Sequence, residues 1–105
     1  MAEGFNKDIL LQAEDIEAAA AFYRDALGFA ITARTDTLVT LLGPSINLFI
    51  DRGPALGPVL EVKVPNVQAA KADLVKRGAK VLREEPEVPR CYVRDPFGLT
   101  YNLAE

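Results

Sequence analysis

Apolar positions along this chain follow the same order twice. In the first round, the apolar run Asp8–Ala13 predicts a strand, and the helical spacing of Ile16, Ala20 and Tyr23 predicts a helix after it. Asp15 precedes that helix as a typical N-cap, and Gly28 follows it as a residue that adopts positive φ cheaply. Three more strands are expected, at Phe29–Arg34, Leu38–Leu42 and Ile46–Asp51.

The second round repeats this order after a Gly- and Pro-rich loop. Val59–Val64 predicts a strand, Asn66 a second N-cap, and Gly78 the end of a second helix. The remaining strands are expected at Lys80–Arg83, Cys91–Arg94 and Leu99–Leu103. The two caps lie 51 positions apart, close to half the chain, which indicates an internal repeat.

The repeat predicts an α+β fold of two βαβββ modules within a single domain, residues 1–105. The modules span approximately residues 6–52 and 58–105, and the loop 53–58 joins them. Each mixed sheet is expected to pack one face on its helix. The other faces are expected to curl around a central groove, the kind of concave surface where small ligands bind.

Composition and charge indicate which kinds of partner the protein can bind and in which cellular compartment it is expected. The net charge is −3 and the basic residues are scattered, so no nucleic-acid surface is expected. No apolar run approaches the ~20 residues of a membrane helix, and residues 1–7 lack the apolar core of a secretory signal. Cys91 is the single cysteine, which excludes an internal disulfide and fits a reducing compartment. We therefore expect a cytoplasmic protein.

Two segments resemble a known family. Asp15–Phe29, with the run FYRDALGF, is similar to the first-helix signature of the vicinal oxygen chelate superfamily, and Asp95–Leu103 is similar to its C-terminal hairpin. That superfamily includes glyoxalase I, extradiol dioxygenases, fosfomycin-resistance thiol transferases and bleomycin-resistance proteins. The resemblance covers nearly the whole chain and implies paired βαβββ modules, usually assembled as a homodimer.

The resemblance also implies where a divalent metal would be held. The family's four ligand positions fall on Asp8, Asn47, Val59 and Asn102. Valine cannot coordinate a metal, asparagine offers a neutral carbonyl oxygen, and the chain contains no histidine. We therefore expect no metal and no cofactor.

Strand alternation, continued from those four positions, predicts which side chains face away from the helices. The residues expected to line the groove and bind a ligand are Asp8, Leu10, Gln12, Asn47, Phe49, Val59, Glu61, Tyr92, Arg94 and Asn102. The residues expected to pack on the helices are Ile9, Leu11, Ile46, Leu48, Leu60, Val62, Val93, Tyr101 and Leu103.

Some side chains have alternative roles. Arg94 could pair with Asp95 or present its guanidinium to a ligand carboxylate. Asn47 and Asn102 could bond a ligand or each other. Cys91 faces the helix side in this register and is interpreted as a small buried apolar residue.

Four functions are compared. The favoured one is a small-molecule-binding protein without metal, sequestering a drug or metabolite as the antibiotic-resistance members of the superfamily do. The second is a metal-independent lyase or isomerase that uses a carboxylate base, with Asp8 and Glu61 as the candidate pair. The third, a metal-dependent lyase or dioxygenase, is opposed by the ligand positions. The fourth is an interaction module whose groove is filled by a partner.

Overall fold

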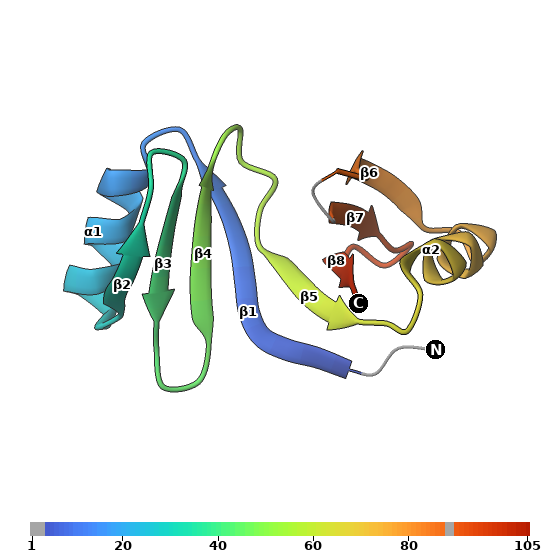
Figure 1. Cartoon of the computed structure of the whole chain (residues 1–105), viewed down its shortest axis with the longest axis horizontal. Helices are drawn as coiled ribbons and strands as arrows, with labels where there is room; N and C mark the ends of the chain where they lie inside the picture. The colour runs from blue at the N-terminus through green and yellow to red at the C-terminus, as the bar shows by residue number, and fades with distance from the viewer. Residues whose placement is uncertain (1–3, 88–89) are drawn as a thin grey trace. The chain divides into compact units, whose positions relative to one another are not determined.

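The computed structural model describes residues 4–87 and 90–105, and in this part of the chain two helices and eight strands form an α+β fold (Figure 1). The expected fold class is confirmed. In chain order the elements are β1 (Gly4–Ala13), α1 (Ile16–Leu27), β2 (Ala30–Arg34), β3 (Leu38–Leu42), β4 (Asn47–Arg52), β5 (Val59–Lys63), α2 (Val67–Lys76), β6 (Lys80–Glu85), β7 (Arg90–Arg94) and β8 (Thr100–Ala104).

By its internal contacts the chain divides into two compact units. Of the described residues, Lys7–Pro58 form the first unit, and Val59–Glu105 together with residues 4–6 form the second. Each unit is a sheet with one helix, as the repeat predicts. The groove expected between the modules stays a prediction. None of the described helices is long and apolar enough to cross a membrane.

In the first module the strands are ordered β2-β3-β4-β1. β1 runs parallel to β4, whereas β2–β3 and β3–β4 are antiparallel. The helix α1 covers one face of this sheet (Figure 1). Its buried residues Ile16 and Ala20 join a core with Val39, Leu41, Leu48 and Ile50.

The second module repeats this plan with the order β5-β8-β7-β6. β5 runs parallel to β8, and the pairs β7–β8 and β6–β7 are antiparallel. Its helix α2 buries Val67, Ala70 and Leu74 only partly, so most of this core comes from the strands. The buried core residues of the strands are Val62, Cys91, Val93, Tyr101 and Leu103, and Val64, just after β5, joins them.

Both helices begin where the cap residues predict. Oδ1 of Asp15 accepts the Ala18 N–H at 3.0 Å, and Oδ1 of Asn66 accepts the Ala69 N–H at 2.9 Å. Gly28 ends α1 with φ 80°, a left-handed conformation that suits glycine. The second helix ends slightly earlier than predicted, because Arg77 is its C-cap and the left-handed turn follows at Gly78.

The prediction of a helix-packed core is confirmed for eight of its nine residues and wrong for Ile46. Those eight lie in or against the two apolar clusters under α1 and α2. Ile46 is 38% exposed because β4 begins only at Asn47, so Ile46 still belongs to the turn. Alternation therefore holds within strands and fails one residue before them.

Each module also carries one irregularity in its outer hairpin. The β2–β3 register shifts between Ile31 and Ala33, and the β6–β7 register shifts between Val81 and Arg83. Such shifts mark an extra residue in one strand and increase the local twist.

Candidate functional site

In the first module, three cross-strand pairs line the sheet face opposite α1. Asp8 pairs with Asn47, Leu10 with Phe49, and Gln12 with Asp51, along the parallel strands β1 and β4. The intervening residues Ile9, Leu11 and Leu48 pack against α1, which places these pairs on the other face. The row is polar at both ends and apolar, with one aromatic ring, in the middle.

The polar ends of this row are held by hydrogen bonds within the module. Nδ2 of Asn47 donates to Oδ1 of Asp8 at 2.9 Å. Oε1 of Gln12 accepts the backbone N–H of Leu56 at 3.2 Å, so the loop after β4 is fastened to β1. Phe49 is half-buried, as expected for a large ring on this face.

In the second module, a matching row crosses three strands. Glu61 of β5 lies opposite Asn102 of β8, which lies opposite Tyr92 of β7. Oδ1 of Asn102 accepts the backbone N–H of Cys91 at 2.9 Å, and its Nδ2 donates to Oε2 of Glu61 at 3.5 Å. Asn6 donates to the other Glu61 oxygen at 2.8 Å. Asn102 is thus a buried bridge between three strands.

The other candidate residues of this module differ in exposure: two are buried and one is exposed. Val59 is fully buried, and Tyr92 is 1% exposed with the Arg90 guanidinium 5.6 Å from its ring centroid. Arg94 is exposed and donates to the Thr100 hydroxyl at 3.0 Å, instead of pairing with Asp95.

The alternative in which Arg94 pairs with Asp95 is therefore wrong. Oδ1 of Asp95 accepts the N–H groups of Phe97 and Leu99 and closes the β7–β8 turn. Asn47 and Asn102 are each hydrogen-bonded within their own module. Their side chains close polar networks inside the sheets.

The residues at the four metal-ligand positions do not fit a transition metal. Val59 has no donor atom, and the one oxygen of the Asn102 amide accepts the Cys91 N–H. Asn47 turns its NH2 group, which cannot coordinate a cation, toward Asp8. Within residues 4–87 and 90–105, no three His, Cys, Asp or Glu side chains are close enough to hold a metal ion.

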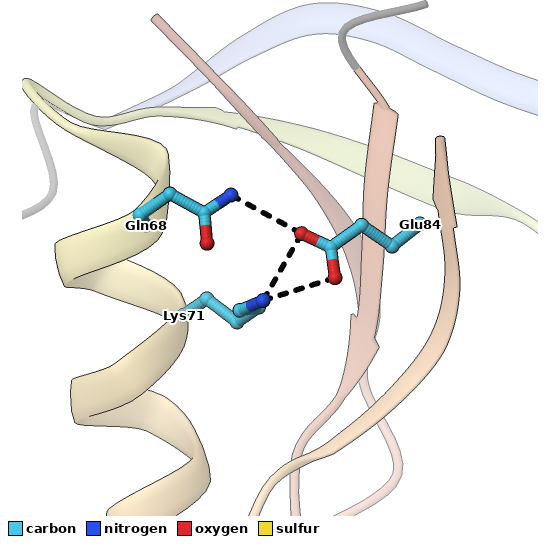
Figure 2. Close-up of polar contacts among 3 residues, drawn as sticks. All are labelled: Gln68, Lys71 and Glu84. Carbon is cyan, nitrogen blue, oxygen red and sulfur yellow. Dashed lines mark hydrogen bonds and ion pairs between the residues drawn. The ribbon is translucent and has the colours of Figure 1, made fainter. Parts of the chain in front are cut away.

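A second feature lies on the helix side of the second module, where the sequence reasoning placed no site. It is a cavity of about 440 Å³ between α2 and the ends of β6, β7 and β8. Figure 2 shows the polar contacts at its edge: Glu84 accepts from Nζ of Lys71 at 2.9 Å and from Nε2 of Gln68 at 3.2 Å. These hydrogen bonds, that of Lys71 first, lower the pKa of the Glu84 carboxyl.

The other groups of this cavity also have partners. Arg90 pairs with Glu85 at 3.0 Å, and the Glu105 carboxylate accepts the first α2 N–H, that of Val67, at 2.9 Å. Cys91 is 1% exposed, and burial, with a smaller contribution from the Glu84 charge, raises the pKa of its thiol. The cysteine is therefore a neutral core residue, as predicted.

The paired βαβββ modules define the fold class. The chain belongs to the glyoxalase-like domain family, which its sequence matches over residues 8–104. The resemblance drawn from the two segments Asp15–Phe29 and Asp95–Leu103 is thereby confirmed at the level of the superfamily. No curated protein matches the sequence.

Solved structures show the same fold at low identity. A glyoxalase/bleomycin resistance protein/dioxygenase superfamily member from Vibrio splendidus 12B01 is 15% identical, with a TM-score of 0.66 over 94% of this chain and 97% of that one. Methylmalonyl-CoA epimerase from Mycobacterium tuberculosis is 15% identical, with a TM-score of 0.61 over 97% and 87%. An extradiol ring-cleaving dioxygenase from B. fuscum is 22% identical, with a TM-score of 0.63 over 96% of this chain but only 32% of that enzyme.

Proposed function

We propose that this protein binds a small organic molecule on the strand faces opposite its helices, without a metal ion. Two rows of side chains support this proposal. The first places Leu10 and Phe49 between polar pairs, and the second aligns Glu61, Asn102 and Tyr92. An apolar surface with a few fixed polar groups is the usual lining of a small-molecule site.

The observation that carries the metal-free part of the proposal is the bonding of Asn102. Its amide oxygen accepts a backbone N–H and its amide nitrogen donates to Glu61, so both ends of the group are in use. A metal at this position would compete with the Cys91 N–H for a neutral amide oxygen, which is a weak ligand for a transition metal. Drug or metabolite sequestration fits this chemistry better than Lewis-acid catalysis.

A thermal-shift screen against antibiotics and metabolites tests the proposal, with elemental analysis of the purified protein beside it. A ligand at about 100 times its Kd is expected to raise the Tm by roughly 10 °C in a domain of this size. The shift should be unchanged by EDTA. A stoichiometric divalent metal whose removal lowers the Tm, or a broad screen without a hit, would overturn the proposal.

The second candidate function is a metal-independent lyase or isomerase that uses a carboxylate base. Glu61 favours it, because Asn6 and Asn102 hold that carboxylate in place on the candidate face. Loss of turnover in Glu61→Gln or Asp8→Asn would support catalysis. Glu84→Gln is the matched control, since Glu84 lies in the same module beside α2.

We also propose a homodimer in the cytoplasm. Exposed apolar residues on both modules, such as Phe22, Leu27 and Phe97, would gain from burial against a second copy. The free Cys91 thiol fits a reducing compartment. Light scattering on the purified protein gives the mass in solution, and a monomer at micromolar concentration would contradict the dimer.

A further inference from the structure

The side chain of Gln12 in β1 carries a buried donor whose hydrogen-bonding capacity is unused. The residue is 8% exposed, and within the described part of the chain its Nε2 atom is buried without a hydrogen-bond partner. Buried amide donors are nearly always paired, because an unpaired one has lost its water and gained nothing. The position therefore calls for an acceptor.

Turning the amide over does not remove the problem. The Gln12 Oε1 atom accepts the N–H of Leu56, so the opposite orientation would set the NH2 group against that donor. The backbone thus fixes which end of the amide is the donor. Its N–H groups remain on the β1 face that Leu10 and Phe49 share.

We propose that the Gln12 NH2 group donates to a carbonyl or carboxylate oxygen of the bound ligand. This inference rests on the proposed function and specifies it. The apolar pair Leu10–Phe49 lies two residues along the strands from Gln12, about 7 Å away. The ligand class is therefore an oxygen acceptor joined by a short linker to a flat apolar group, as in an arylalkyl ketone or acid.

The oxygen reaches Gln12 through a movement of the loop after β4 that leaves the Leu56 N–H bonded to Oε1. Gly57, next to Leu56, has φ 86°, a left-handed conformation that only glycine adopts freely, so it is a suitable hinge. The ligand oxygen in turn pairs with the donor that has none in the free protein.

The experiment is an NMR titration of the full chain with 4-phenylbutan-2-one, 3-phenylpropanoate and 3-phenylpropylamine. The first two probes carry the oxygen acceptor, and the amine carries only donors. The Gln12 side-chain amide signal is assigned by its loss in Gln12→Glu. The Gln68 side-chain amide, already bonded to Glu84, is the internal reference.

The ketone or the acid is expected to shift the Gln12 amide signal and to leave the Gln68 amide signal in place. The amine is expected to shift neither signal. Gln12→Glu keeps the acceptor for Leu56 and removes the donor, so its Kd for the ketone should be about tenfold weaker. Gln12→Met removes both the acceptor and the donor, and its affinity for the ketone should fall by a similar factor.

Three results would overturn the inference. One is no response of the Gln12 amide to either oxygen-bearing probe, and another is equal affinity for the ketone in Gln12→Glu. The third is a long-lived internal water, seen as a water–amide NOE at Gln12 that persists when the probes are bound. A hit in the thermal-shift screen alongside any of these would leave ligand binding intact and refute only the role of Gln12.

Discussion

Replacing Asn102 by Asp tests whether both ends of this side chain are committed to the fold. The aspartate keeps an oxygen for the Cys91 N–H but sets a second carboxylate oxygen where Nδ2 now donates to Glu61 at 3.5 Å. Two unit charges at that separation repel by about 5 kcal/mol at most, taking an effective dielectric constant of about 20. Relaxation of the pair reduces this, so we expect a loss of about 2–4 kcal/mol in the free energy of unfolding at pH 7.

The assay is urea denaturation of a double-mutant cycle. Glu61→Gln restores a donor opposite the new carboxylate, so the double variant should regain about 2 kcal/mol or more relative to additivity. Asn66→Asp makes the same change at an exposed helix cap and should be nearly neutral. A stable Asn102→Asp variant, or a penalty that Glu61→Gln leaves unchanged, would refute the reasoning.

Three further predictions concern the start of helix α1 and the side of the second module that faces α2. Asp15→Ala should cost about 1 kcal/mol in urea denaturation, because the Ala18 N–H loses its acceptor; no measurable cost would contradict the cap. The stability advantage of the wild type over Glu84→Gln should be present at pH 7 and disappear as the pH falls through the lowered pKa of Glu84, and a pH-independent difference would count against the bonds to Lys71 and Gln68. Cys91 should react with Ellman's reagent only at the rate of unfolding at pH 8, because burial raises the pKa of its thiol; rapid labelling of the native protein would show an open path to it.

Much of the fold was predictable because local signals and packing agree. The cap residues Asp15 and Asn66 each precede a helical apolar stripe, and both bond the N–H three residues on. Strand alternation predicted the helix-packed face correctly and failed only at Ile46, where the strand had not yet begun. These features depend on residues close together in the sequence.

The side-chain partners were less predictable, since they depend on contacts distant in sequence. The two asparagines were expected to face a ligand or each other, yet Asn47 bonds a residue 39 positions away and Asn102 bonds Glu61 at 41 positions. The Gln68–Lys71–Glu84 contacts were missed altogether. Gln68 and Lys71 are three residues apart, on one side of α2, but Glu84 joins them only once β6 has been placed beside that helix.

The irregular outer hairpins bear on the ancestry of the chain. Ile31 and Ala33 flank the register shift in the first module, and Val81 and Arg83, each 50 positions later, flank it in the second. An inserted residue serves no general need of a strand pair, so independent evolution of two modules gives little reason for it to recur at the same place. Copying of one ancestral half and fusion to itself would leave this trace. The irregularity would then be older than the caps and the candidate faces, which have since diverged between the two halves.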